Sequence, residues 1–194
     1  MIKLSFNFRL PDWVEPFLAQ QPQRFNTSQE RMQLAVDLAR RNVDAGSGGP
    51  FGAAVFELAG GKLLSVGVNI VLEQQCSILH AEMVALALAQ RRLHSFDLGA
   101  EGLAEHELVT SVEPCAMCLG ALAWSGVGRV LCAGRDEDAR AIGFDEGDKP
   151  ADWPSTLQRR GIEVVRDVLR PQAVNVLQHY AQTNGLIYNP ARHS

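Results

Sequence analysis

Apolar residues recur with helical spacing between residues 27 and 45. They stand three or four positions apart, on one face of a helix, at Met32, Ala35, Val36, Ala39 and Val43. Thr27 and Glu30 form the T-x-x-E pattern of a capping box, which satisfies free backbone amides at the start of a helix. The pattern therefore predicts an amphipathic helix that ends near Ala45, before the turn sequence GSGGP at 46–50.

Shorter apolar runs farther along the chain predict alternating strands and helices. Two runs, 51–58 and 63–70, flank the sequence AGGK, which is typical of a hairpin turn. The later elements are expected as helices over 80–93, 114–124 and 171–183, strands over 107–111, 127–133 and 162–165, and a helical turn over 157–161. Irregular structure is expected for an arm over 1–26 and for loops over 71–79 and 134–155.

This order of elements predicts a single α/β domain. Helices that alternate with strands cover both faces of one sheet, because each element has an apolar side to bury. The opening hairpin makes two neighbouring strands antiparallel, so we expect a mixed sheet of about five strands. The sequence contains no repeat and no linker that would separate two domains. We therefore expect one three-layer α/β/α domain over 1–194, with the N-terminal arm over 1–26 and a C-terminal tail over 184–194.

The charge balance argues against a protein whose main partner is nucleic acid. Eighteen Lys and Arg residues oppose 22 Asp and Glu residues, which gives a net charge of −4 and a pI of about 5.7. Non-specific nucleic-acid binding depends instead on an excess of cations. No run approaches the roughly 20 apolar residues of a membrane helix, and the N-terminus lacks the apolar core of a signal peptide. We expect a cytoplasmic protein whose four cysteines are reduced.

Two short motifs contain side chains that bind zinc. His80-Ala81-Glu82 and Pro114-Cys115-Ala116-Met117-Cys118 each stand at the start of an expected helix. Cysteines three apart lie about 60° apart around a helix, so Cys115 and Cys118 point the same way, and the helix dipole at this end favours thiolates. Together with the imidazole of His80 they would leave the fourth position of a tetrahedral zinc ion to water, which distinguishes catalytic from structural zinc.

The C-x-x-C sequence alone also occurs in redox pairs and in structural zinc sites. A structural site needs a fourth ligand, and Cys76 is the only nearby candidate. The combination with H-A-E favours catalysis. Two thiolates cancel the charge of the ion and leave its water weakly acidic, so Glu82 has a task as the base that takes a proton from this water and passes it to the substrate.

The two motifs together resemble the H-x-E…P-C-x-x-C signature of the zinc-dependent cytidine deaminase-like superfamily. Within it the chain is most similar to bacterial guanine deaminases, over GGPFGAAVFE (48–57), SVEPCAMCLGALAW (111–124) and AIGFDEG (141–147), and at Asn69. tRNA adenosine deaminases share some of these features. Ala116 stands where guanine deaminases often have proline, a departure that leaves the ligands unchanged.

The resemblance implies a fold and a role for each matching residue. The fold would be the cytidine deaminase-like three-layer α/β/α arrangement. His80, Cys115 and Cys118 would bind one zinc ion per chain, with Glu82 as the proton shuttle and Glu146 as a second catalytic carboxylate. Substrate contacts are expected at Asn69, Ala81, Phe51, Trp124, Asp145 and Tyr188.

Several of these residues also fit purely structural roles. Asn69 suits a turn at the end of a strand, and Phe51 and Trp124 suit the core. Asp145 and Glu146 suit a solvated acidic loop, and which of the two would act on the substrate stays open. The C-terminal tail would cover the site in its own chain or in a dimer mate, since related enzymes exchange this segment between subunits.

We therefore expect a hydrolytic deaminase of a free aminopurine that converts guanine to xanthine and ammonia. Its partners would be a small nucleobase and a second copy of the chain, without nucleic acid or membrane. The alternatives are a tRNA adenosine deaminase, a deaminase of another amino-heterocycle such as cytosine or ammeline, and a deaminase-like binding protein without activity. The acidic pI weighs against the RNA enzyme, and the intact H-A-E and P-C-x-x-C motifs weigh against the binding protein.

Overall fold

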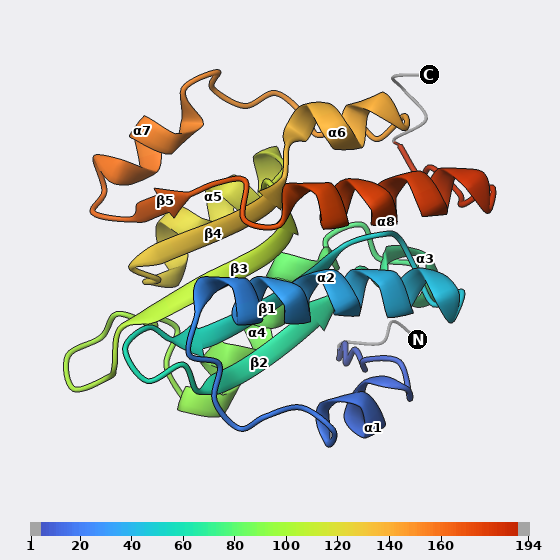
Figure 1. Cartoon of the computed structure of the whole chain (residues 1–194). Helices are drawn as coiled ribbons and strands as arrows, with labels where there is room; N and C mark the ends of the chain where they lie inside the picture. The colour runs from blue at the N-terminus through green and yellow to red at the C-terminus, as the bar shows by residue number, and fades with distance from the viewer. Residues whose placement is uncertain (1–4, 190–194) are drawn as a thin grey trace.

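A mixed sheet forms the centre of the computed structural model, which describes residues 5–189. The strand order is β2-β1-β3-β4-β5 (Figure 1). β1 (Gly52–Glu57) pairs antiparallel with both β2 (Leu63–Val68) and β3 (His106–Val112). β4 (Arg129–Gly134) and β5 (Glu163–Val165) extend the sheet in parallel. The five-stranded mixed sheet predicted from the sequence is thus confirmed.

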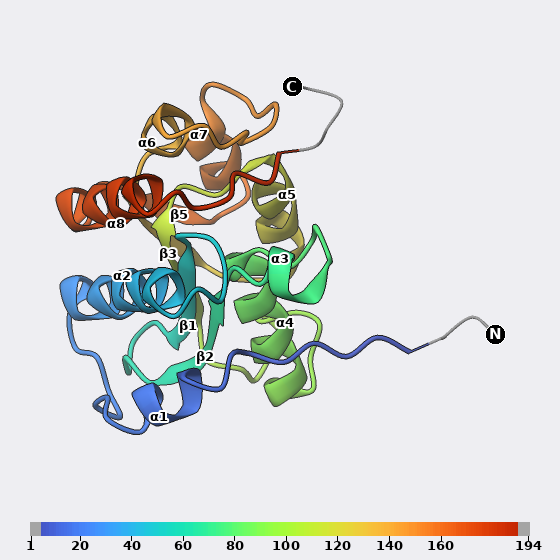
Figure 2. The same ribbon diagram turned by 90° about the vertical axis from the view of Figure 1, so that its right-hand side faces the viewer.

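Helices cover both faces of the sheet. α2 (Ser28–Asp44) and α8 (Arg170–Gln182) lie side by side on one face, and α4 (Ala81–Leu93) and α5 (Ala116–Ser125) lie on the other (Figure 2). This is the expected three-layer arrangement. Within the described part of the chain, no helix is both long and apolar enough to span a membrane.

The strands read as continuous apolar runs because both of their faces are buried. Successive side chains on a strand point to opposite faces, and in β3 Leu108 packs on the α4 side while Val109 packs on the α2 side. Both residues are fully buried. At Gly67 a Cβ would lie 2.1 Å from the carbonyl oxygen of Ala81. The absent side chain therefore lets the first turn of α4, which begins next to His80, approach the sheet closely.

The boundaries of the long elements follow the sequence pattern closely. The capping box of α2 is present: Glu30 N–H donates to Thr27 Oγ1 over 3.1 Å, and the Glu30 carboxylate accepts from Thr27 N–H over 3.1 Å. α5 differs slightly from the expectation, because Cys115 is its N-cap and Pro114 precedes it. Cys115 thus lies at the N-terminal end of the helix.

Four short helices lie where irregular structure or a later turn was expected. They are α1 (Val14–Leu18), α3 (Val71–Gln74), α6 (Asp136–Ala141) and α7 (Trp153–Gln158). Each is too short for an apolar periodicity to be recognised in the sequence. Tertiary contacts stabilise them instead, since each buries one or two residues, such as Phe17 in α1 and Trp153 in α7.

Candidate active site

Three potential metal ligands meet where α4 and α5 begin. His80 is the N-cap of α4, and Cys115 and Cys118 lie at the N-cap and in the first turn of α5. His80 Nδ1 is 3.5 Å from Cys115 Sγ and 3.8 Å from Cys118 Sγ. The three residues predicted as ligands therefore converge, although His80 and Cys115 are separated by 35 positions in the chain.

The spacing of these atoms fits a tetrahedral zinc ion. Zinc binds imidazole nitrogen at about 2.0 Å and thiolate sulfur at about 2.3 Å, which places neighbouring ligand atoms about 3.5 to 3.8 Å apart. Within residues 5–189 this is the one group of three such side chains close enough together to hold a metal ion. Cys76 is not part of it, so these three ligands leave one position open for water.

The two thiols are coupled through a hydrogen bond. This bond from Cys118, together with His80, lowers the pKa of Cys115 to about 4. The same hydrogen bond and burial raise the pKa of Cys118 well above its usual value. Burial opposes protonation of His80, but the hydrogen bond and negative charge of Cys115 raise its pKa overall. The group thus already contains one thiolate, and a bound divalent ion would displace the remaining protons.

Two buried carboxyl groups lie beside the ligands. Glu82 and Glu146 are each only 6% exposed. Burial and the negative charge of Cys115 raise the pKa of Glu82. Burial, Cys115 and Glu82 raise the pKa of Glu146 to about 8. The burial of Glu146 shows that its interpretation as part of a solvated loop is wrong, and the raised pKa of each carboxyl group favours its protonated form.

A cavity of about 280 Å³ opens next to the ligands and both carboxyl groups. This volume is slightly below the usual range of ligand pockets, about 300–1,000 Å³, and suits a single heterocycle. One wall is aromatic: the ring of Phe144 packs edge-on against Phe51, at 4.9 Å between centroids, and against Tyr188, at 5.3 Å. An apolar wall facing a polar, ionisable wall is the arrangement expected for a planar polar base.

Asn69 lines the polar side of the cavity and is only 1% exposed. Its Oδ1 accepts a hydrogen bond from Val71 N–H over 3.3 Å, and its own backbone N–H donates to Phe51 O over 3.1 Å. Among residues 5–189, Nδ2 has no hydrogen-bond partner. A buried amide donor without a partner is costly, so this atom is available to an acceptor on a ligand.

The C-terminal tail forms part of the cavity wall within the same chain. Tyr188 and Asn189 both line it. Asn189 Oδ1 accepts a hydrogen bond from Asp145 N–H over 2.9 Å, and its Nδ2 donates to Gly143 O over 2.8 Å. The tail is therefore joined to the loop that carries Glu146. Residues 190–194 of the expected lid lie outside the described residues, and exchange of the tail between subunits stays a prediction.

Comparison with known proteins places this architecture in a family. The family described as the cytidine and deoxycytidylate deaminase zinc-binding region matches residues 25–134, which include all three ligands and Glu82. The chain belongs to this deaminase family. With the complete ligand group and the buried Glu82, it is a zinc-dependent hydrolytic deaminase.

Several relatives of this deaminase have been characterised. The guanine deaminase of Bacillus subtilis (strain 168) is 39% identical over 127 residues, which are 62% of this chain and 77% of that protein. The structure of the guanine deaminase from Nitrosomonas europaea is 42% identical, with a TM-score of 0.88 over 94% of this chain and 99% of that one. The tRNA-specific adenosine deaminase of Rickettsia bellii is 29% identical over 48% of this chain and 61% of its own length.

Two predicted substrate contacts do not lie in the cavity. Trp124 is 83% exposed, neither in the core nor on the cavity wall. It follows Cys115 by nine residues, about 13.5 Å along a helix, so α5 carries it away from the ligands. Ala81 is fully buried in the core between α4 and the sheet, and it is absent from the cavity wall. Neither residue therefore lines the cavity of this chain, and a substrate contact of either one stays a prediction.

The other predicted residues do line the cavity: Phe51, Asn69, Asp145, Glu146 and Tyr188. Phe144, Asn189 and Glu113 also line the cavity and were not predicted from the sequence. Phe144 was the aromatic residue within the G-F-D-E-G segment, and Glu113 directly preceded P-C-A-M-C, so a signal was present for both. Asn189 had none, because its role depends on the tail folding back onto the loop.

Proposed function

We propose that this deaminase hydrolyses guanine to xanthine and ammonia, with one zinc ion per chain bound by His80, Cys115 and Cys118. The observation that carries the proposal is the second buried carboxyl group, Glu146, in a base-sized cavity beside Glu82. The amino-bearing carbon of guanine lies between two ring nitrogens. Its deamination requires a proton for the ring and another for the departing ammonia, and two acids supply both.

The proposed chemistry assigns each proton to a side chain. Zinc, when bound, would supply a Lewis acid that makes a water molecule more acidic. Glu82 takes one proton from the attacking water molecule as the water oxygen bonds to the amino-bearing carbon, and delivers the proton to a ring nitrogen. The bond between carbon and the amino nitrogen then breaks, the nitrogen keeps the electron pair, and Glu146 protonates it. Ammonia leaves, and the proton of the new hydroxyl group returns to Glu146, which leaves xanthine.

The remaining wall of the cavity supports a free base as the substrate. The Asn69 amide would donate a hydrogen bond to an acceptor on the purine, while Phe51 and Phe144 would contact its faces or edges. Tyr188 covers the cavity, and burial raises its pKa well above the usual value, so it is a neutral and largely apolar cover. A ribose attached to the base would collide with this cover. Free bases should therefore be better substrates than nucleosides or tRNA.

The test is ammonia release from a panel of guanine, adenine, cytosine, ammeline, cytidine, guanosine and a tRNA anticodon stem. Guanine should show the highest kcat/KM, and chromatography should identify xanthine as the product. The Glu82→Gln protein, which retains the ligand group, provides the blank. Faster turnover of guanosine or the anticodon stem than of every free base would reject the proposal and favour the RNA enzyme. A preference for cytosine or ammeline would retain the deaminase and change its substrate.

A further inference from the structure

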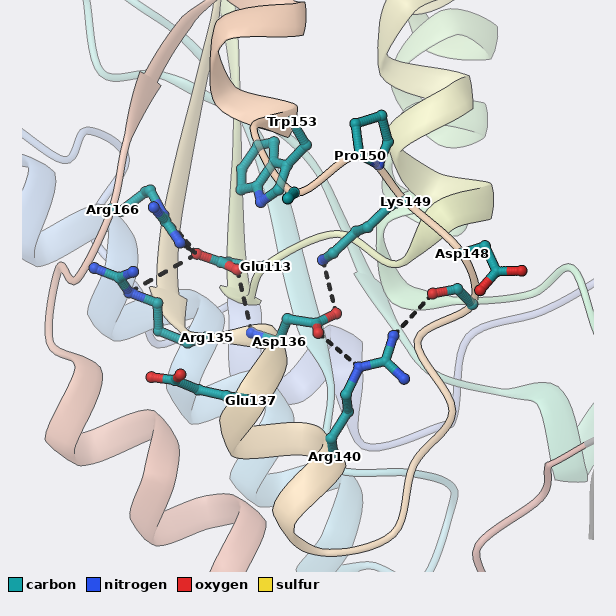
Figure 3. A pocket seen from close by; sticks show the side chains of 12 residues that line it. Glu113, Arg135, Asp136, Glu137, Arg140, Asp148, Lys149, Pro150, Trp153 and Arg166 are labelled. Carbon is teal, nitrogen blue, oxygen red and sulfur yellow. Dashed lines mark hydrogen bonds and ion pairs between the residues drawn. The ribbon is translucent and has the colours of Figure 1, made fainter.

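A cluster of charged side chains lies next to the candidate active site and surrounds an open hollow of about 630 Å³ (Figure 3). Glu113 and Gly147 border both this hollow and the catalytic cavity. The hollow is not built for an anion, because its cations are already paired with carboxylates: Arg135 with Asp167, Arg140 with Asp136, Lys149 with Asp136, and Arg166 with Glu113. A role in holding the neighbouring segments together fits this charge balance better.

Lys149 is the most buried cation of the cluster, with a side chain only 7% exposed. Its Nζ donates a hydrogen bond to Pro114 O over 2.9 Å and pairs with Asp136 Oδ1 over 2.9 Å. It also lies 5.6 Å from the centre of the Trp153 ring. Figure 3 shows Lys149 and Asp136 pointing toward each other beneath Trp153. A buried ammonium is tolerated only when its donors are paired in this way.

Pro114, whose carbonyl oxygen accepts the hydrogen bond from Lys149, is the neighbour of a potential metal ligand in the chain. Pro114 immediately precedes Cys115, and Ala116 immediately follows it. Ala116 N–H donates to Glu146 O over 2.9 Å, while Lys149 Nζ holds Pro114 O. Residues 146–149 therefore contact the backbone on both sides of Cys115. The distance between the Glu146 carboxyl group and the ligand group depends on these two hydrogen bonds.

A third contact supports the same loop. Arg140 donates to Gly147 O over 2.8 Å and to Asp136 Oδ2 over 2.7 Å. Asp136 thus joins Arg140 to Lys149. Arg140 holds the loop at Gly147, and Lys149 holds it at residue 149 through Pro114 O. Gly147 has a φ of +69°, and a Cβ there would lie 3.0 Å from the Ala116 Cβ. The loop is consequently pressed against the start of α5, with little room for an alternative position.

We propose that Lys149 is a positioning residue that clamps the loop carrying Glu146 onto the backbone beside Cys115. The proposal rests on the proposed function, because Glu146 is there the acid that protonates the leaving ammonia. Lys149 does not contact the substrate: it acts through Pro114 O and through the loop. Without its side chain, residues 146–149 would keep the Ala116–Glu146 backbone hydrogen bond, the Arg140 contact and the local bond from Gly147 N–H to Asp145 Oδ1, but would lose the hydrogen bond to Pro114 O. Catalytic groups must be held within about 0.5 Å of their productive geometry.

The test compares Lys149→Met with wild type. Lys149→Met should lower kcat for guanine about 10- to 100-fold, because a displacement of about 1 Å can cost up to about 10²-fold. KM should change less than about threefold, since the residues that would bind the purine remain in place. Zinc content per chain should be unchanged. Lys149→Arg, which keeps a cationic donor, should recover most of the lost kcat. These values separate a positioning role from loss of metal or fold.

Lys62→Met is the matched control. Lys62 also pairs with a glutamate, Glu57, over 3.2 Å, but it is half exposed and lies in the hairpin turn. The kcat of Lys62→Met should equal that of wild type. If Lys149→Met does not fold, Lys149→Gln and Arg140→Gln carry the same test, with a fall in kcat at unchanged zinc content. A kcat within about twofold of wild type in folded Lys149→Met or Lys149→Gln, or a loss that only parallels zinc content, overturns the proposal.

A measurement without substrate separates this proposal from the proposed function. Hydrogen exchange of peptides covering 143–150 and 114–118 should become at least about tenfold faster in Lys149→Met and stay unchanged in Lys62→Met. If wild type does not deaminate guanine, the function fails, yet faster exchange at these two segments would still show the clamp. Unchanged exchange would overturn the clamp whatever the substrate is.

Discussion

Replacement of Asn69 by alanine tests the interpretation of the cavity most directly. Asn69 lines the cavity, and its buried Nδ2 has no hydrogen-bond partner among residues 5–189, whereas its Oδ1 accepts a hydrogen bond from Val71 N–H. If the amide is a substrate contact, Asn69→Ala removes the one donor that meets a purine acceptor at this position. We expect reduced kcat/KM for guanine and nearly normal stability of the free protein.

The magnitude follows from the burial of the site. An acceptor left unpaired in a closed cavity costs about 1–3 kcal/mol. At about 1.4 kcal/mol per factor of ten, kcat/KM should fall about 5- to 150-fold. In the free protein the change removes only the 3.3 Å bond to Val71 and a few packing contacts. A loss of about 1 kcal/mol should lower Tm by about 2–4 °C in a domain of this size.

The assay is the initial rate of guanine consumption, followed by ultraviolet absorbance, for wild type and Asn69→Ala. Asn26→Ala is the control, because Asn26 is an exposed asparagine before α2. Parallel measurements with 2-aminopurine, which lacks the guanine carbonyl oxygen, identify the acceptor. A loss confined to guanine indicates this oxygen, and an equal loss indicates a ring nitrogen. A kcat/KM within about twofold of wild type would refute the contact and the assignment of the cavity.

Further predictions concern the ligands, the two acids and the surface ion pairs. Glu82→Gln should retain zinc, measured by elemental analysis, and lose about 10²–10⁴-fold in kcat; near-normal turnover would place the proton shuttle elsewhere. Wild type should contain about one zinc per chain, and Cys118→Ser should lose metal and thermal stability together; an active metal-free protein would exclude the ligand assignment. Glu146→Gln should lower guanine turnover at least about 10-fold at constant zinc content, and full activity would return this residue to a structural role. Hydrogen bonds from Arg135 lower the pKa of Asp167. This pair therefore stabilises the fold above the unfolded carboxyl pKa of about 3.9 and loses its effect as pH falls through the lower folded value. Arg135→Gln should reduce the urea midpoint at pH 7, and the difference from wild type should shrink as the pH falls below about 3.9; a constant difference would contradict the linkage.

Local patterns in the sequence were sufficient for much of the fold. The capping box at Thr27 and Glu30 and the apolar face of α2 involve residues within a few positions of one another, so their energetics can be read from the chain directly. The hairpin between β1 and β2 was recognisable for the same reason. The short helices α3 and α6 were not, because helices of this length are stable only through tertiary packing.

The ligand group could also be predicted from the sequence, although His80 and Cys115 are far apart in the chain. Zinc chemistry restricts the ligands to a few residue types, and each motif places its ligands at the start of an element. The burial of Glu146 could not be predicted from the sequence in this way. The same acidic segment would be solvated if the tail and Lys149 did not pack around it, and Trp124 would be buried or exposed depending only on what faces α5.

The sequence by itself determined the alternation of helices and strands, the mixed sheet, the group of His80, Cys115 and Cys118, and the position of Glu82 beside it. The tertiary structure alone decided that Glu146 is a buried acid with a pKa raised to about 8 and that Asn189 joins the tail to the loop. The physical reason is the range of the interactions. Periodicity and capping act between neighbours in the chain, whereas desolvation of Glu146 and the 2.9 Å contact between Asn189 and Asp145, 44 positions apart, exist only after distant segments have packed together.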